Sequence, residues 1–412
     1  MPVVVVGAGQ SGLAASRVLA ERGIEHVTLE RGDIANTWRH ERWDSLHLLT
    51  PNWMTRLPGQ TYDGDDPDGF MSVAELVTFL DRYATDHPGD IRTGVTVEGV
   101  GAATNGRYLV GTDAGSWNAA AVVLASGAYN TAAVPAMAEA LRPDIAQVTA
   151  HDYKHPGQLA PGRVLVVGAS ATGLQLAKEI LDSGREVTIS VAEHVRLPRS
   201  YRDHDAMWWL ETLGRLDERW DEVDDLVRAR NVPSPQLVGT SDGSTLDLNV
   251  LVDAGAELVG QLASLDGTRA SFSGSLRNVC SLADLKANRF LKMADEWADA
   301  QGWPTVDDPV RVAPTRVPDD PRTMIDLATD GFATALWATG FKADYSWLML
   351  DGVFDRKGRL RHDGGVVTAA PGIYRMGLNF LRRRKSTYLY GAETDATELV
   401  DHLEGYLETP TR

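Results

Sequence analysis

Two glycine-rich turns have the residue types and spacing that bind a dinucleotide pyrophosphate. The first follows a valine run at residues 3–6 and precedes a helical pattern over residues 13–22. In such a turn the first glycine permits the tight bend, the second lets a phosphate approach the backbone, and the third lets helix and strand pack closely. The positive end of the helix dipole then faces the phosphates. The predicted binding residues of this turn are Gly7, Gly9, Gln10, Ser11 and Gly12.

An acidic residue supports the first site. Glu30 ends the apolar strand predicted at residues 27–29 and lies 18 residues beyond Gly12, where a carboxylate binds ribose hydroxyls. The neighbouring Arg31 is a further candidate contact. The alternative is a turn that binds no ligand, but the strand, the turn, the helix and the acid together favour a dinucleotide.

The second turn repeats the first with two changes. It joins a strand at residues 164–167 to a helical pattern over residues 174–183, and Ser170 replaces its middle glycine. Ser190 stands where the first copy has Glu30. An acid there would repel a 2′-phosphate, so its absence favours NADPH. The candidate residues of the second site are Gly168, Ser170, Ala171, Thr172, Gly173 and Ser190.

Three arginines follow this second unit. Arg196, Arg199 and Arg202 could supply countercharge to a 2′-phosphate, although Glu193 lies among them. The alternative is that they form a solvated face.

The elements that position these residues form two strand–helix–strand units in one α/β chain. Two dinucleotides imply FAD on the first unit and NADPH on the second, with hydride passing between their rings. Buried strands near residues 119–127 and 336–341 end in small residues, with Gly127, Thr339 and Gly340 as candidate contacts. We predict two Rossmann-like domains, with an NADPH domain (156–310) inserted into an FAD domain built from residues 1–155 and 311–412.

An aromatic segment follows the first unit. Its candidate flavin contacts are Trp38, Arg39, Trp43 and Thr50, since an isoalloxazine ring needs stacking surface and polar contacts at its edge. The alternative is a packed loop between the domains. Helical patterns are predicted over residues 203–232 and 284–300, with their tryptophans in the core or at a domain interface. The basic run at residues 382–385 is either solvated or close to phosphate.

Composition excludes several functional classes. The chain has 412 residues with 40 Lys+Arg against 57 Asp+Glu, and this net charge of −17 argues against a nucleic-acid or anionic-membrane partner. Its single cysteine, Cys280, excludes an intrachain disulfide and a flavoprotein that uses a redox dithiol. The scattered histidines predict no metal site. Without an apolar run of about 18–20 residues or a basic leader, we expect a cytoplasmic protein.

These residues resemble the flavin-containing monooxygenase family, in its bacterial single-component branch, over most of the chain. The first glycine turn is similar to the family's FAD fingerprint, and residues 338–341 are similar to its ATG motif. Trp38-Arg39 and Thr50-Pro51 resemble its flavin-side loop, and His151 resembles the histidine of its signature, whose upstream half is absent. Asn52 is similar to the asparagine that holds the oxygenated flavin in family members.

The resemblance implies an FAD- and NADPH-dependent monooxygenase. One atom of O2 would reach an N-, S- or activated C-centre of a small-molecule substrate through a C4a-hydroperoxyflavin, with Asn52 as the candidate catalytic residue. Family members are often dimers, so a homodimer is expected. The alternative is a flavoprotein reductase that passes electrons to a partner protein or a quinone, because the same two nucleotide domains would serve it.

Overall fold

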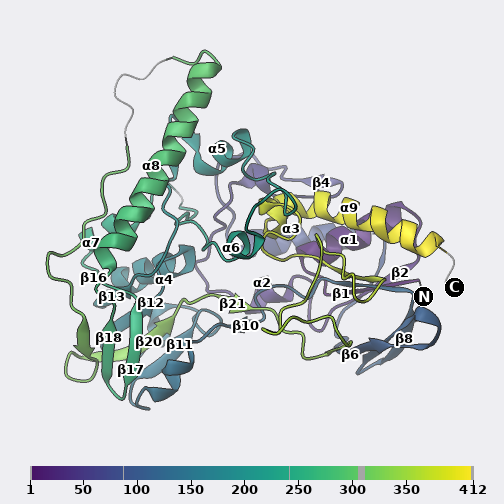
Figure 1. Ribbon diagram of the computed structural model, residues 1–412, viewed down its shortest axis with the longest axis horizontal. Helices are drawn as coiled ribbons and strands as arrows, with labels where there is room; N and C mark the ends of the chain where they lie inside the picture. The colour runs from purple at the N-terminus through teal and green to yellow at the C-terminus, as the bar shows by residue number, and fades with distance from the viewer. Residues whose placement is uncertain (1, 87, 241, 305–310, 410–412) are drawn as a thin grey trace.

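The first of two five-stranded parallel sheets contains the N-terminal strand. The computed structural model describes residues 2–86, 88–240, 242–304 and 311–409, and both sheets lie within that part of the chain (Figure 1). The strand order of the first sheet is β23-β9-β1-β2-β5. Its strands are β1 (Val3–Val6), β2 (His26–Leu29), β5 (Asp90–Arg92), β9 (Ala121–Leu124) and β23 (Ile373–Arg375). All four valines of β1 are buried, as in a parallel sheet that is covered on both faces.

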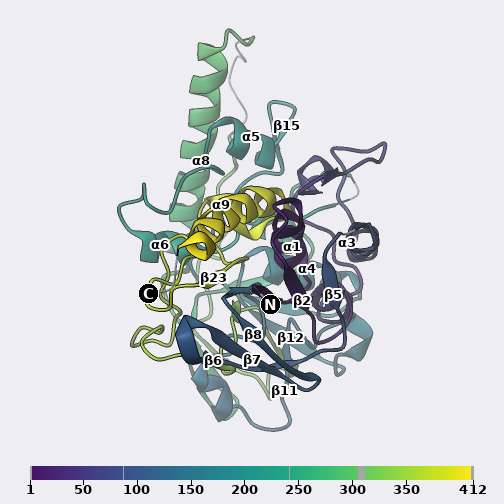
Figure 2. The same cartoon turned by 90° about the vertical axis from the view of Figure 1, so that its right-hand side faces the viewer.

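Different layers cover the two faces of this sheet. One face packs against α1 (Gln10–Glu21), α3 (Val73–Thr85) and α9 (Leu389–Glu408). The other face packs against a smaller sheet of β6 (Val97–Ala102), β7 (Tyr108–Thr112), β8 (Gly115–Ala119) and β22 (Leu348–Met349). Figure 2 shows α9 beside α1, with the β6–β8 ribbon on the opposite side of the strands. A capping box between Ser72 and Glu75 fixes the start of α3.

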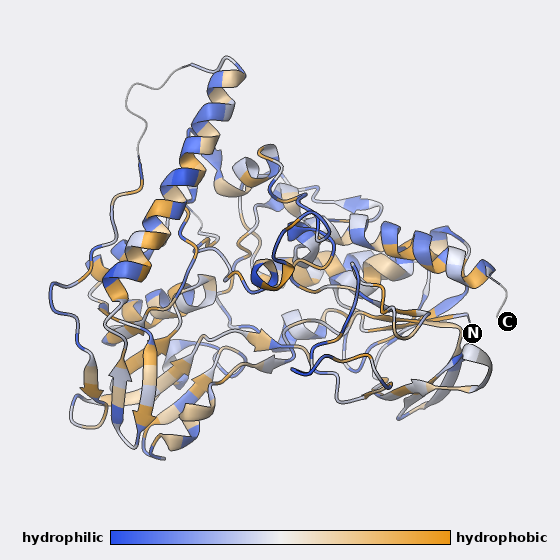
Figure 3. Ribbon diagram, viewed as in Figure 1, coloured by the Kyte–Doolittle hydropathy of each residue, from blue (hydrophilic) through white to orange (hydrophobic). Residues whose placement is uncertain are grey.

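The second sheet has the same architecture. Its order is β11-β20-β12-β13-β16, and its strands are β11 (Ala146–Thr149), β12 (Arg163–Val167), β13 (Val187–Ser190), β16 (Glu257–Val259) and β20 (Phe332–Trp337). One face packs against α4 (Ala171–Asp182), α7 (Leu248–Asp253) and α8 (Leu276–Ala300). The other packs against β17 (Leu262–Asp266), β18 (Arg269–Phe272) and β19 (Met324–Asp326). Figure 3 shows hydrophobic strands here and mixed faces on α8 and α9.

This arrangement confirms the predicted fold class of two Rossmann-like sheets, one inserted in the other. The order β9-β1-β2-β5 in the first sheet corresponds to β20-β12-β13-β16 in the second. Helices α1 and α4 begin at Gln10 and Ala171, three residues before the predicted starts. The last glycine of each turn therefore lies inside the helix, on the side that meets the strand.

The domain limits differ from the predicted ones. The second sheet takes β11 and β20 from residues 146–149 and 332–337, outside the predicted range of 156–310. Residue 310, the predicted boundary, lies outside the described residues. The short strands β10 (Thr131–Ala132) and β21 (Phe341–Lys342) pair with each other where the chain crosses between the sheets. Turn-forming prolines mark chain reversals, but they do not show which sheet a later strand joins.

The region predicted as helical over residues 203–232 is not one helix. It contains β15 (His204–Asp205), α5 (Ala206–Thr212) and α6 (Leu226–Arg230), preceded by β14 (Ser200–Tyr201). Trp209 is fully buried in a satellite core, as expected for these tryptophans. Helix α8 starts eight residues before the predicted 284 and projects from the body in Figure 1. The other helices and strands are α2 (Asn36–His40), β3 (Arg56–Leu57) and β4 (Gln60–Thr61).

Candidate functional site

The first glycine turn has the geometry of a phosphate cradle. Gly7 has φ +103°, and a Cβ there would lie 2.7 Å from the Ala125 carbonyl oxygen. A Cβ on Gly12 would lie 1.8 Å from the Gly7 carbonyl oxygen, so α1 packs too closely on β1 for any side chain. A Cβ on Gly9 would meet nothing within 4 Å. Gly7 and Gly12 therefore fix the backbone, whereas Gly9 leaves open space at the start of α1.

The second turn reproduces this geometry. Gly168 has φ +117°, and a Cβ there would lie 2.4 Å from the Ala338 carbonyl oxygen. A Cβ on Gly173 would lie 2.1 Å from the Gly168 carbonyl oxygen. Ser170, in the place of Gly9, is the extended N-cap residue of α4. The glycine repeat in the sequence is thus a repeat of close backbone contacts.

Both turns open into one cleft of about 1930 Å³ between the two sheets. The carboxyl ends of β1 and β12 point toward it, which is where open α/β sheets bind ligands. Most predicted cofactor residues line this cleft: Gly7, Gly9, Gln10, Ser11, Glu30, Arg31, Trp38, Trp43, Thr50, Gly127, Gly168, Ser170, Ala171, Thr172, Ser190, Thr339 and Gly340. The structure therefore brings residues from both domains to a common space.

Glu30 lies at the carboxyl end of β2 and is 8% exposed. Its Oε2 accepts a hydrogen bond from the Ala8 backbone N–H at 2.8 Å, and its Oε1 accepts one from Gly32 N–H at 3.1 Å. These bonds orient the carboxylate and leave lone pairs for hydroxyl donors in the cleft. Arg31 also reaches the cleft, where its Nη2 is 2.8 Å from Glu41 Oε1.

The aromatic segment, which begins within α2, joins the two domains. The Trp38 indole N–H donates to Gln10 Oε1 at 3.2 Å, at the first turn. Trp43 is 5% exposed and packs into the core of the second domain. Lys154 Nζ donates to the carbonyl oxygens of His40 and Arg42 at 2.6 and 2.8 Å. The segment is both a wall of the cleft and a packed loop between the domains.

Apart from the arginines after β13, four predicted residues do not line the cleft: Gly12, Arg39, Asn52 and Gly173. The Arg39 guanidinium pairs with Asp81 on α3 at 2.8 Å. Gly12 is covered by the first turn. Asn52 is 6% exposed, and its Nδ2 donates to the Asp66 carbonyl oxygen at 2.9 Å, behind a cleft wall formed by residues 46–50. The Asn52 Nδ2 group thus holds a loop, while the buried Oδ1 has no hydrogen-bond partner among the described residues.

The arginines after β13 are not available to a cofactor, which corrects the prediction for Arg196 and Arg199. Both are 3% exposed or less. Arg196 pairs with Asp247 and Asp284 at 2.5 and 2.6 Å, and Arg199 pairs with Asp205 at 2.6 Å. These carboxylates come from later segments of the chain, so proximity to Ser190 in the sequence could not reveal the pairing.

Arg202 is engaged in the same way, because its Nε lies 2.7 Å from Asp295 Oδ1. Ser190 itself lines the cleft, and its Oγ is 3.1 Å from the Gly260 carbonyl oxygen. Lys286 on α8 is 3.1 Å from Glu193, which offsets that acid at the cleft edge.

Sequence reasoning missed a buried cation beside the carboxyl end of β9. Arg375 in β23 is fully buried. Its guanidinium donates to Tyr345 Oη at 2.9 Å and to the backbone oxygens of Leu124, Met376 and Gly127 at 2.5 to 2.7 Å. Within the described residues no carboxylate pairs with it, so a net positive charge stands behind Gly127. An arginine ending an apolar strand was the only available signal.

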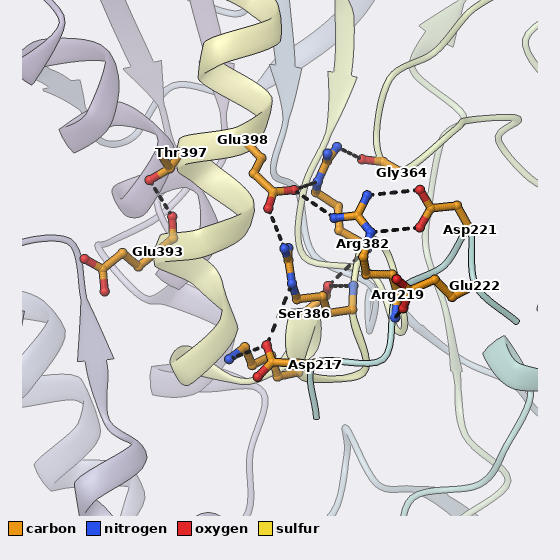
Figure 4. Close-up of polar contacts among 12 residues, drawn as sticks. Asp217, Arg219, Asp221, Glu222, Gly364, Arg382, Ser386, Glu393, Thr397 and Glu398 are labelled. Atoms are coloured by element: carbon orange, nitrogen blue, oxygen red, sulfur yellow. Dashed lines mark hydrogen bonds and ion pairs between the residues drawn. The ribbon is translucent and has the colours of Figure 1, made fainter. Parts of the chain in front are cut away.

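The side chains of residues 382–385 are all ion-paired, and Arg384 and Lys385 form an ionic clamp between the domains. Arg382 and Arg383 lie 2.7 and 2.5 Å from the carboxylate oxygens of Glu398 on α9 (Figure 4). Lys385 pairs with Asp217 at 2.8 Å, and Arg384 pairs with Glu218. These ion pairs show that the run is not a freely solvated face, and Arg384 in addition lines the cleft.

His151 lies near the crossing strands. Its ring centroid is 4.9 Å from that of Phe341 in β21, and its Nδ1 is 3.9 Å from Glu41 Oε2. Burial lowers the pKa of His151 below its ordinary value and outweighs the attraction of Glu41. The guanidinium of Arg42 lies 5.3 Å from the centre of the Trp38 ring and 5.9 Å from those of Tyr129 and Phe341. Aromatic rings and a basic group therefore line the cleft at the crossing.

The paired features that thiol or metal chemistry needs are not found among the described residues. Cys280 is buried, and burial raises the pKa of its thiol to about 12. In the part of the chain that the structure describes, no three His, Cys, Asp or Glu side chains are grouped to hold a metal ion. No helix among the described residues is long and apolar enough to cross a membrane.

Comparison with known proteins identifies the family. The pyridine nucleotide-disulphide oxidoreductase family matches residues 4–223, which is just over half of the chain. A Geobacillus kaustophilus protein named uncharacterized oxidoreductase CzcO-like is 28% identical over 403 residues, covering 97% of each chain. The indole-3-pyruvate monooxygenase YUCCA1 of Oryza sativa subsp. japonica is 33% identical over 215 residues, which are 51% of each chain.

A solved structure shares the fold over the whole length. The flavin-containing monooxygenase from Stenotrophomonas maltophilia superposes with a TM-score of 0.68 at 21% identity, covering 98% of each chain. The disulphide in the family name has no counterpart in this chain, because its sequence contains one cysteine. The chain belongs to the pyridine nucleotide-disulphide oxidoreductase family, as a flavin-dependent oxidoreductase with the fold of the flavin-containing monooxygenases.

Proposed function

We propose that the protein is an FAD-dependent, NADPH-consuming monooxygenase that inserts one oxygen atom of O2 into an N-, S- or activated C-centre of a small molecule. One observation supports this most directly: two phosphate cradles open into the same cleft of a chain whose one thiol is buried away from it. Electrons that enter from a nicotinamide have no dithiol through which to leave. They pass to O2 or to an external acceptor.

The residues of the first domain fit FAD. Gly9 leaves the space that a pyrophosphate needs, and the start of α1 supplies backbone N–H groups and the positive end of the helix dipole. Glu30 is held in position for the ribose hydroxyls. Ser126 lines the cleft, and its buried Oγ has no hydrogen-bond partner among the described residues, so it is free to contact the cofactor.

The residues of the second domain fit a nicotinamide dinucleotide. Gln236 Nε2 donates to the Ala169 carbonyl oxygen at 2.7 Å and holds the second turn in place. Gln175 lines the cleft, and its buried Oε1 lacks a partner within the described chain. With Arg196 and Arg199 engaged elsewhere, the proposed preference for NADPH rests on Ser190, which places no acid against a 2′-phosphate.

When bound, the flavin supplies hydride acceptance and activation of O2, and the protein supplies position and a dry surrounding. Overall, NADPH, a proton, O2 and the substrate give NADP⁺, water and the mono-oxygenated product. Trp38, Trp43 and Leu46 form an apolar wall that excludes water from the crossing between the two cradles. YUCCA1 and the Stenotrophomonas protein are both monooxygenases, and this likeness supports oxygen transfer over simple reduction.

The test begins with the purified protein, which should contain FAD or bind it when FAD is added. Anaerobic NADPH should reduce the flavin, and mixing with O2 should give a transient absorbance distinct from oxidised and reduced flavin. Product masses should increase by one oxygen atom across a panel of amines, sulfides and ketones. Reoxidation without a transient or an oxygenated product would instead support an electron-transferring reductase. Failure to bind FAD would reject both functions.

A further inference from the structure

One segment of the second domain crosses the cleft and lies against the first domain. We call residues 216–231 the bridging segment. The Trp220 N–H donates to the Arg382 carbonyl oxygen at 3.0 Å, and the Lys385 N–H donates to the Leu216 carbonyl oxygen at 3.1 Å. The ionic clamp described above reinforces these backbone bonds. The bridging segment is therefore held in a defined position over the cleft.

Arg230 ends α6 and brings a cation from the bridging segment into the cleft. Its carbonyl oxygen accepts a hydrogen bond from Asn379 Nδ2 at 2.9 Å, and its Nε donates to the Phe380 carbonyl oxygen at 3.3 Å. Its buried Nη2 has no hydrogen-bond partner within the described residues. Burial lowers the pKa of Arg230, yet its charge persists because an arginine starts from 12.5. Leaving a buried N–H group of a cation without a hydrogen-bond acceptor costs free energy. Binding of an anion at Arg230 is therefore favoured.

His362 adds a neutral donor to the same part of the cleft. Its Nδ1 accepts a hydrogen bond from the Gly365 N–H at 3.1 Å, so the ring proton lies on Nε2. Burial, followed by the charges of Arg230 and Arg375, lowers the pKa of His362 to about 3. The ring is therefore uncharged near neutral pH and offers one N–H to the cleft.

The surrounding charges leave Arg230 without a dedicated acid. Arg359 lowers the pKa of Arg230 and Asp363 raises it. Arg359 itself pairs with Asp355 at 2.7 Å. Arg375 adds a second buried positive charge, as described above. The local balance is positive within a protein whose net charge is −17.

We propose that this part of the cleft binds the carboxylate of the substrate through Arg230 and His362. The inference rests on the proposed monooxygenase function and specifies its substrate class as small organic carboxylates. The subsite is linked to the first turn through residues 377–380, because the Arg230 Nε donates to the Phe380 carbonyl oxygen and a Cβ on Gly377 would lie 2.6 Å from Ser11 Oγ. A guanidinium also matches the planar fork of a carboxylate.

Calorimetry with benzoate and its uncharged analogue benzamide tests the subsite without depending on turnover. The FAD-loaded protein should bind benzoate at least about tenfold more tightly than benzamide. Arg230→Gln should weaken benzoate binding at least about tenfold and leave benzamide unchanged. Arg228→Gln is the matched control, because Arg228 lies on the same short helix and is exposed. FAD affinity is measured for every variant.

Two results would overturn the subsite. Equal binding of benzoate by Arg230→Gln and the unmodified protein would remove Arg230 from it. Loss of FAD affinity in Arg230→Gln with benzoate binding unchanged would assign the guanidinium to a cofactor phosphate. If either result is found for a protein that binds FAD and oxidises NADPH, only the proposed substrate class is rejected and the proposed function stands. Benzoate binding by a protein that fails to take up FAD would reject the monooxygenase proposal and retain the anion site.

Discussion

Gly9→Ala separates binding of a dinucleotide from stability of the fold. Gly9 is the N-cap of α1 with φ −80° and ψ −175°, a conformation that alanine adopts freely. A Cβ there would meet nothing within 4 Å, so the protein itself opposes no methyl group. Losing glycine at an N-cap costs about 0.5–1 kcal/mol, and the lower entropy of the unfolded chain offsets a similar amount. The free energy of unfolding should change by less than about 1 kcal/mol.

The effect on FAD should be much larger. A methyl group in the open space would hold the pyrophosphate away from the N–H groups at the start of α1. A hydrogen bond to a charged group contributes about 1.5–3 kcal/mol, so losing one raises the Kd for FAD by about tenfold to a hundredfold. Quenching of FAD fluorescence on binding to the apoprotein measures this Kd, and urea unfolding measures stability.

Two other glycines serve as controls for this experiment. Gly405→Ala, in α9 with nothing within 4 Å, should leave FAD affinity unchanged. Gly12→Ala should destabilise the fold, since its methyl group would overlap the Gly7 carbonyl oxygen. Unaltered FAD affinity in Gly9→Ala would refute the assignment of this turn as the FAD cradle.

Three further substitutions test the remaining assignments. Glu30→Ala should raise the Kd for FAD by about tenfold or more in the same fluorescence titration, because ribose hydroxyls lose their acceptor. Arg196→Gln should cost about 3 kcal/mol in urea unfolding, since it leaves the carboxylates of Asp247 and Asp284 without their cationic partner. The ratio of NADPH to NADH oxidation should stay the same, and a changed ratio would restore Arg196 to the cofactor site. Burial raises the pKa of Asp395 from 3.8 to about 7, so the folded state holds a proton that the unfolded state has released between these values, and the free energy of unfolding falls as the pH rises through this range. Asp395→Asn should remove that fall. The free energy of unfolding of the variant, relative to that of the unmodified protein, should therefore rise by up to about 4 kcal/mol between about pH 4 and about pH 8. The same difference between the two proteins at both pH values would contradict this.

The sequence predicted best what depends on local backbone geometry. The glycines of both turns could be assigned because the backbone atoms that a side chain there would overlap lie within a few residues or at the end of an adjacent strand. Glu30 could be placed because it directly follows a strand that the sequence predicts, and the end of that strand lies at the carboxyl edge of the sheet. Both predictions needed only the turn and the elements on either side of it.

What depended on distant partners could not be predicted. Arg196 and Arg199 were wrong as cofactor contacts, because their carboxylates arrive from segments up to 88 residues away. The helical pattern over residues 203–232 was interrupted, since residues 216–220 form turns whose backbone hydrogen-bonds to residues 382–385, with one isolated β-bridge between Arg219 and Arg383. Arg230 showed no local signal, because its lack of a partner is a property of the folded cleft.

The bridging segment changes the mechanics of the two-domain frame. Strands β10 and β21 pair where the chain crosses between the halves, and Trp43 and Lys154 add contacts between the halves beside that crossing. The pairs of Lys385 with Asp217 and of Arg384 with Glu218 attach the halves at a further place, on the bridging segment, and restrict rotation of one half against the other. The spacing between the two cradles is therefore set when the chain folds. The entropic cost of fixing the two cradles relative to each other is met when the chain folds, so binding of the dinucleotides does not have to offset it.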